Sequence, residues 1–194
     1  LYYQSPTNQG NPDLLAEKAW MYQGGIRWNG RSLSFQSNLF ARFSQNNIDW
    51  TKRPDDPKWV TQNITQLTTV GFEVRGKWKP EFNGFVANPT LRFGYRFGYI
   101  SMKDPLFDSR YVLDYLQHKA TFSAQFNVSK KFSLILDNRF QDRAGWFTNW
   151  TEDGMAYSQD YIPFYLLDIK LSYALRWGKI VGMVNNALNQ EYMD

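Results

Sequence analysis

The chain has 194 residues, of which 18% are aromatic, and it carries a formal net charge of +4. The cations are spread along the sequence without a basic block, which argues against nucleic-acid binding, because such proteins gather Lys and Arg on one face. Cysteine is absent, which excludes disulfide frameworks, thiol catalysis and cysteine zinc sites. No apolar run approaches the roughly 20 residues that a transmembrane helix needs.

Apolar and polar residues alternate in eight segments, and this period of two is typical of strands with one apolar face. A turn-rich segment at 8–13 comes first. We expect the strands, in chain order, at about 20–28, 32–46, 69–78, 90–99, 119–128, 132–141, 167–177 and 179–186.

The connections between these strands alternate between tight and long. Asn29-Gly30, Ser129-Lys130 and Gly178 mark tight turns, and a Pro/Asn/Gly turn spans 80–89. Longer loops are expected at 52–58, 103–109 and 145–161. Short turns on one side and long loops on the other are typical of an up-and-down barrel in an outer membrane.

Water or lipid could cover the apolar faces. Soluble sheets usually have strands of about 5–6 residues, whereas these segments reach about 10–15, more than the ~9–11 that cross a bilayer. Large aromatics lie at the segment ends, where they suit the two lipid interfaces: Trp20, Trp28, Trp78, Tyr99 and Trp177. The pattern favours a membrane barrel, and a soluble binding module stays the alternative, which would remain in solution without detergent.

Three motifs in order carry a family resemblance. The first is Gly10-Asn11-Pro12-Asp13-Leu14 with Glu17-Lys18, and the second joins 48–50, 62–64 and 71–73 in an "I-D-W … x-N … G-x-E" pattern. The third runs from Leu167-Asp168-Ile169 through 184–189 to Tyr192. Together they resemble the C-terminal part of a TonB-dependent outer-membrane receptor.

The resemblance implies an all-β fold, an antiparallel up-and-down transmembrane β-barrel, with about eight strands of a larger barrel of the 22-strand type. Residues 1–194 would be the C-terminal portion of that barrel, with the plug domain, the TonB box and the final strand outside it. The implied location is the outer membrane of a Gram-negative bacterium, in contact with its lipid.

The implied function is active import of a scarce large nutrient, without enzymatic activity and without a cofactor. The implied partners are the inner-membrane TonB complex, acting through the missing N-terminal part, a small-molecule ligand, and a surface-exposed lipoprotein that captures ligand.

The residues at 109–116 and 141–145 look most like the cobalamin (vitamin B12) branch of the family. Cobalamin is therefore the first expectation for the ligand. A siderophore or another TonB-dependent substrate is the alternative. A passive pore, or a small barrel of eight strands that closes on itself, remains open as well.

Two sets of residues are candidates for the site. Exposed loop aromatics often mark binding sites, and those expected to meet the ligand or a surface partner are Trp59, Trp146, Phe147, Trp150, Tyr157 and Tyr161. Charged residues on the polar faces are expected to face the lumen, where they would contact the plug or steer substrate: Glu73, Arg75, Arg92, Arg96, Asp137, Arg139, Asp168 and Lys170.

Catalytic and metal sites are not indicated. His118 is the only histidine, and no Ser or Cys lies at a spacing that suggests a nucleophile, so we interpret it as structural. Asp55-Asp56 and Asp104 with Asp108 lack the spacing of a calcium loop and are interpreted as solvated loop charge.

Overall fold

The computed structural model describes residues 4–52, 56–81, 87–102, 108–109, 115–151 and 153–193. The side chains at 64–65, 87–88, 108–109, 148 and 150 lie outside this description. Within it the chain forms these strands: β1 (Asn8–Gln9), β2 (Lys18–Asn29), β3 (Leu33–Lys52), β4 (Trp59–Trp78), β5 (Ala87–Met102), β6 (Asp108–Ser109), β7 (Tyr115–Asn127), β8 (Phe132–Ala144), β9 (Trp146–Trp150), β10 (Ala156–Asp160), β11 (Phe164–Ala174) and β12 (Lys179–Val184).

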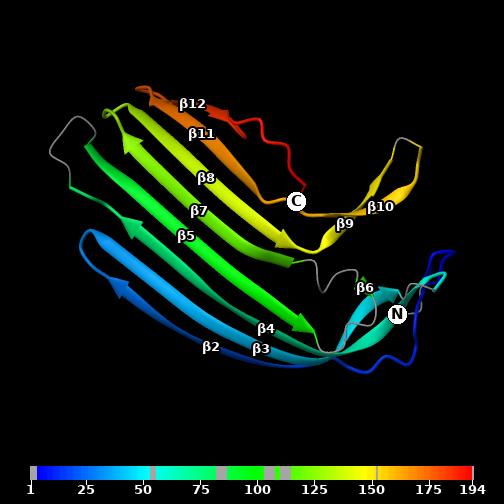
Figure 1. The fold of residues 1–194 in the computed structure, drawn as a ribbon. Helices are drawn as coiled ribbons and strands as arrows, with labels where there is room; N and C mark the ends of the chain where they lie inside the picture. The colour runs from blue at the N-terminus through cyan, green and yellow to red at the C-terminus, as the bar shows by residue number, and fades with distance from the viewer. Residues whose placement is uncertain are drawn as a thin grey trace.

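One curved sheet contains most of these strands (Figure 1). Its path runs β2-β3-β4-β5-β7-β8-β11-β12, and each pair along it is antiparallel. The short strands β1 and β6 join at β4 and β3. The expected all-β, up-and-down order is confirmed. The path has two ends, so these residues form an arc of wall and not a closed barrel.

The tight turns lie together at one end of the sheet, and the long hairpins lie at the other (Figure 1). The Gly30 N–H donates to the Leu33 carbonyl at 2.8 Å, and the Leu175 N–H donates to the Gly178 carbonyl at 2.8 Å. In the β7–β8 turn the Ser129 hydroxyl accepts from the Phe132 N–H at 3.0 Å. The short connections therefore lie at one end of the wall and the long connections at the other.

Strands β3 and β4 are longer than the alternation predicts, and the boundaries expected at 46 and 69 are wrong. Asn46 adopts a left-handed conformation (φ 55°), which Asn tolerates better than most residues. The pairing register with β4 does not change across Asn46, but the buried positions on β3 change there from Ser44 to Asn47 and Asp49. The strand pairing continues to Thr51 and Val60, so the two strands extend to the borders of the loop expected at 52–58.

The segment expected as a long loop at 145–161 is also a hairpin. Strands β9 and β10 pair in a separate two-stranded sheet, from Trp146 opposite Asp160 to Trp150 opposite Ala156. Gly145 has φ 101°, a conformation that Gly adopts at no steric cost. This residue allows the chain to leave β8 at an angle, which separates the hairpin from the wall.

Large apolar side chains cover one face of the wall and are exposed there. Trp20 is 73% exposed and Leu39 is 65% exposed. The members of this outer face include Tyr22, Ile26, Trp28, Phe43, Val70, Trp78, Phe93, Tyr99, Phe122, Phe140, Tyr165, Leu171 and Tyr173. An apolar surface this continuous needs a covering, and lipid is the covering that an alternating wall of this length fits. No described segment is a helix long and apolar enough to cross a membrane.

The first two sequence motifs hold the segment before β2 against the β3–β4 hairpin. The Leu15 N–H donates to the Asn63 side-chain oxygen at 2.8 Å, and the Asn63 amide donates to the Leu15 carbonyl at 2.9 Å and to the Asn46 carbonyl at 2.7 Å. The Ile48 N–H donates to the Glu17 carboxylate at 2.7 Å. The residues of the first two motifs therefore have a structural role, since they hold the segment before β2 to the β3–β4 hairpin.

The third motif ties the segment after β12 to β11. The Asp168 carboxylate accepts from the Asn186 N–H at 2.7 Å, and the Ala187 N–H donates to the Leu167 carbonyl at 2.7 Å. The Tyr192 ring lies 4.7 Å from the buried Phe164 ring, centroid to centroid. The signature residues therefore fold the chain back beside β11.

Candidate functional site

The face opposite the apolar one is polar, and the strand register aligns its residues in rows. Directly opposed residues share a face, and one row reads Arg27, Gln36, Arg75, Gly94, Thr121 and Arg139 across β2 to β8. The next row toward the tight turns contains Lys77, Arg92, Ser123, Asp137 and Asp168. All eight residues expected at the lumen lie on this inner face, including Lys170, two residues after Asp168.

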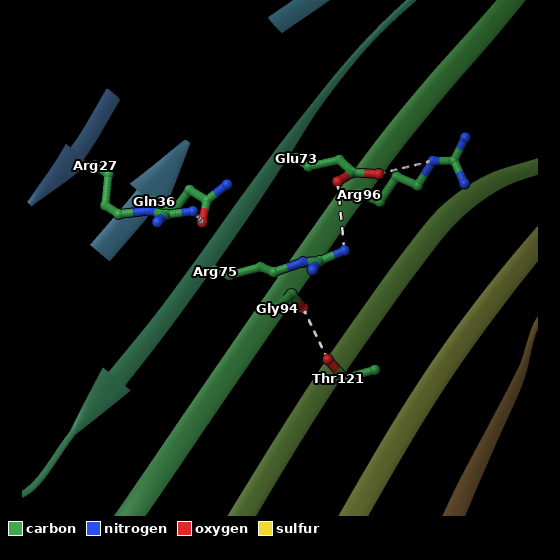
Figure 2. A network of polar contacts seen from close by, with 7 residues as sticks. All are labelled: Arg27, Gln36, Glu73, Arg75, Gly94, Arg96 and Thr121. Atoms are coloured by element: carbon green, nitrogen blue, oxygen red, sulfur yellow. Dashed lines mark hydrogen bonds and ion pairs between the residues drawn. The ribbon is translucent and has the colours of Figure 1, made fainter. Parts of the chain in front are cut away.

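A small polar network lies at the centre of the inner face (Figure 2). The Glu73 carboxylate lies 3.5 Å from the Arg75 guanidinium and 3.5 Å from the Arg96 guanidinium. The Arg27 guanidinium donates to the Gln36 side-chain oxygen at 3.0 Å. The Arg75 side chain is 74% exposed, so these are solvent-screened contacts that each contribute little to stability.

The inner face encloses a hollow of about 680 Å³ that spans β2 to β11. Of the expected lumen residues, it is lined by Arg75, Arg92, Asp137, Arg139 and Asp168, whereas Glu73, Arg96 and Lys170 lie outside its lining. Arg27, Lys77 and Lys119 add further cations to the lining. The hollow is therefore predominantly cationic, with two carboxylates on the side of β8 and β11.

An aromatic cluster lies where the β9–β10 hairpin meets the wall. The Phe147 and Tyr161 rings are 5.2 Å apart, and the Arg143 guanidinium lies 5.3 Å from the Tyr161 ring centre. The Tyr161 N–H donates to the Gly145 carbonyl at 3.4 Å, which closes the base of the hairpin. We call these three side chains, Arg143, Phe147 and Tyr161, the rim cluster. It can offer a flat apolar surface together with a cation.

The other expected loop aromatics are not part of the rim cluster. Tyr157 lies on β10 and is 45% exposed, and Trp146 is half-buried at the base of β9. The backbone of Trp150 pairs with Ala156 at the far end of the hairpin. Trp59 begins β4, where it pairs with Asn8 of β1. The structure therefore brings Phe147 and Tyr161 together, whereas the side chain of Trp150 lies outside the described residues.

The sequence reasoning missed Arg143 as a site residue. The sequence did indicate the position of Arg143, because Arg139, Gln141 and Arg143 alternate along β8 on the inner face. The reasoning also missed Gln159, whose side-chain oxygen accepts from the Asn149 amide at 2.7 Å on the hairpin. No pattern in the sequence indicated that the expected loop was a ribbon, so this pair could not be foreseen.

His118 lies on the outer face, opposite Phe97. Its Nδ1 is 2.7 Å from the Tyr95 hydroxyl, and its ring is 5.1 Å from the Phe97 ring. These contacts agree with a structural role near the membrane interface. Within the described ranges no group of three or more metal-ligating residues comes together. Asp55 and Asp104 lie outside the described residues, as does the side chain of Asp108.

Fold and inner face together define a segment of wall from an outer-membrane barrel. Residues 1–187 match the family model described as "TonB dependent receptor-like, beta-barrel". The chain belongs to this family of receptors, which lie in the outer membrane of Gram-negative bacteria and are not enzymes.

Solved structures with the same fold are distant in sequence. The FrpB iron transporter from Neisseria meningitidis superposes with a TM-score of 0.65 at 12% identity, over 96% of this chain and 28% of that one. The pyoverdine receptor FpvA from Pseudomonas aeruginosa PAO1, bound to pyoverdine, has a TM-score of 0.67 at 16% identity, over 98% and 28%. The copper transporter OprC has a TM-score of 0.66 at 13% identity, over 91% and 26%.

No curated protein sequence matches the chain. It spans less than a third of the length of the solved receptors. At these identities the likeness concerns the fold, and the ligands named for those receptors are properties of those receptors.

Proposed function

We propose that the complete protein actively imports a scarce large nutrient across the outer membrane, with energy from an inner-membrane TonB complex. The observation that carries this proposal is the two-sided wall. Its outer face is apolar and exposed, and its inner face is polar and lines a hollow of about 680 Å³. The rim cluster, at the end with the long hairpins, supports capture of the ligand before it enters.

The first candidate for the ligand is cobalamin. Support comes from the likeness of residues 109–116 and 141–145 to the cobalamin branch, although 110–114 lie outside the described residues. Arg143 belongs to the second of these segments and lies over Tyr161 in the rim cluster. A ligand with a broad, partly apolar surface suits a site built from two stacked rings and a cation.

A ferric siderophore is the second candidate, and one observation favours it. The hollow is lined by six cations, Arg27, Arg75, Lys77, Arg92, Lys119 and Arg139, against the two carboxylates Asp137 and Asp168. A surface with this excess of positive charge attracts anionic solutes. Chelators that present carboxylate or phenolate oxygens to iron carry such charge.

The test is a titration of the full-length protein, purified in detergent, with cyanocobalamin and with ferric siderophores. Saturable binding of cyanocobalamin alone supports the first candidate, and binding of a siderophore alone replaces it with the second. Uptake into cells with and without a functional TonB complex tests active import. Equal uptake in both would make the protein a passive pore and overturn the proposal. A tagged surface lipoprotein that captures ligand would co-purify with the receptor only when ligand is present.

A further inference from the structure

The end of the sheet with the tight turns carries a concentration of positive charge. Six exposed cations lie there, at or beyond the strand ends: Arg31, Lys79, Lys130, Lys131, Arg176 and Lys179. Among the described residues Glu81 is the one carboxylate at or beyond the same strand ends. The end with the long hairpins carries both signs, with Asp153 and Asp160 beside cations such as Lys52. The positive charge is therefore a property of one end of the wall.

The cations gather in two groups, which we call the turn patches. The first turn patch, Arg31 and Lys79, joins the β2–β3 turn to the end of β4. The Lys79 N–H donates to the Ser32 carbonyl at 2.7 Å, so the two cations lie on adjoining segments. Two large rings end the apolar face beside them, since Trp28 is 54% exposed and Trp78 is 43% exposed. Aromatic rings at such positions mark the level of the membrane–water interface.

The second turn patch joins the β7–β8 turn to the β11–β12 turn. The Ala174 N–H donates to the Lys131 carbonyl at 2.7 Å, and on its other side Ala174 is directly opposite Lys179. Neighbouring strands lie about 4.8 Å apart, so the cations of the two turns lie close together. Trp177 in the second turn is 87% exposed and ends the apolar face there. The patch consists of Lys130, Lys131, Arg176 and Lys179.

The turn patches are not neutralised within the described part of the chain. None of their six cations makes an ion pair with a described carboxylate, and none lines the hollow of the inner face. Lys and Arg can lay their carbon stems along apolar surface while the charge stays in water. The cations therefore lie exposed at the level where lipid headgroups surround the wall.

We propose that the turn patches bind the phosphate groups of anionic phospholipids in the periplasmic leaflet around the barrel. Short turns of such a wall face the periplasm, and Lys and Arg close to an anionic membrane surface are attracted to it. A guanidinium can donate two parallel hydrogen bonds to a phosphate, and an ammonium adds a point charge. The adjoining Trp rings set the depth at which these groups meet. This inference concerns the surrounding membrane and does not depend on the imported ligand.

The experiment uses the full-length protein in detergent and adds an equimolar mixture of phosphatidylglycerol and phosphatidylcholine with identical acyl chains. Native mass spectrometry measures the ratio of the two lipids that stay bound. We expect a preference for phosphatidylglycerol of at least about fivefold, which falls as salt is added, because salt screens exposed charges. The double variant Lys130→Gln with Lys131→Gln should lower this preference at least about threefold. Should the double variant not fold, Lys130→Gln alone carries the same comparison.

Two control variants accompany this comparison. Lys52→Gln with Lys58→Gln removes the same charge at the end with the long hairpins and should keep the preference. Lys130→Arg with Lys131→Arg keeps the charge of the turn and should keep the preference as well. No preference in the wild-type protein, or an equal loss in the Lys52 and Lys58 variant, would overturn the proposal.

Two further arms separate membrane lipid from other anions. Glycerol 3-phosphate, which has the headgroup phosphate without acyl chains, should not displace the bound phosphatidylglycerol at equal concentration. Displacement would assign the turn patches to a free phosphate and overturn the proposal. Sedimentation with purified peptidoglycan tests the cell wall as the partner. Binding to peptidoglycan that the Lys130 and Lys131 variant loses, while its lipid preference persists, would also overturn the proposal.

Discussion

Two hairpins extend beyond the wall at the same end of the sheet (Figure 1), and they are built differently. The outer part of β3–β4 continues the wall strands and buries polar residues, among them Thr61 at 0% and Asp49 at 3% exposure. The β9–β10 hairpin is a separate two-stranded sheet, and β10 is mostly exposed. One hairpin holds the chain in place, and the other presents side chains.

The contacts of each hairpin explain this difference. The β3–β4 extension makes hydrogen bonds to the segment before β2. The Ile48 N–H donates to the Glu17 carboxylate, and the Asn63 side chain binds the backbone N–H and carbonyl of Leu15. At the base of the β9–β10 hairpin the Arg143 guanidinium of β8 contacts the Tyr161 ring, and the Phe147 and Tyr161 rings contact each other. Ring contacts tolerate small shifts that hydrogen bonds do not, which is compatible with the proposal that the second hairpin contacts ligand.

The largest effect is expected for Asn63→Ala. The substitution removes three hydrogen bonds, two to Leu15 and one to the Asn46 carbonyl, and should lower the stability of the tied region by about 2–3 kcal/mol. Hydrogen exchange of the Leu15 amide should accelerate strongly, while exchange in β7 and β8 should stay unchanged. Unchanged exchange at Leu15 would mean that the tie does not hold the segment.

Tyr161→Ala should weaken ligand binding by the full-length protein about tenfold, because it removes the ring contact to Phe147 and the cation contact to Arg143. Titration with whichever candidate ligand the full-length protein binds measures this effect. Tyr161→Phe is the control, since it keeps the ring, and should bind as wild type does. Equal loss in both variants would show that the hydroxyl and not the ring matters.

Glu17→Gln is expected to have a smaller effect than Asn63→Ala. The amide oxygen can still accept from the Ile48 N–H, but the charge-assisted part of the bond is lost, at a cost of about 1 kcal/mol. Amide exchange at Ile48 is the direct measurement. An effect as large as that of Asn63→Ala would indicate that Glu17 carries further contacts.

Substitutions at rings of the second hairpin outside the rim cluster should have the smallest effects on stability. Tyr157→Ala and Trp146→Ala are expected to change it by less than about 0.5–1 kcal/mol and to reduce ligand affinity only if these rings touch ligand. Thermal melting of both variants, followed by the same titration, measures the two quantities separately. Unchanged affinity in both variants would mean that these two rings only pack within the hairpin and do not touch ligand.

Strand alternation made most of the wall predictable. The eight strands of the path and their two faces follow from the period of two, because lipid and water lie on opposite sides of the wall, and the strand order follows from the short connections. The strand ends at 46 and 69 could not be predicted in the same way. Beyond Asn46 the faces of the β3–β4 hairpin mix polar and apolar residues, so the period of two fades there, and the alternation does not record the left-handed conformation of Asn46.

The site was predictable on the wall and less so at the rim. Arg75, Arg92 and Asp137 follow from strand parity, and the structure places them on one face around the hollow. The rim cluster required the angle at Gly145 and the pairing of β9 with β10, which bring Phe147 to Tyr161. A composition rich in aromatics marked the region but could not select which rings meet.

Strand β12 pairs with β11 only from Ile169 to Ala174. Toward the rim, β11 continues to Phe164. Within the described residues, this part of β11 makes separate hydrogen bonds to the segment after β12: the Leu167 carbonyl accepts from the Ala187 N–H, and the Asp168 carboxylate accepts from the Asn186 N–H. Toward the rim, therefore, β11 is held to the segment after β12 by a few separate hydrogen bonds instead of a continuous strand ladder. Among the strand pairs along the path from β2 to β12, β11–β12 has the shortest ladder of those described, so it should be the first pair of this arc to open in hydrogen exchange.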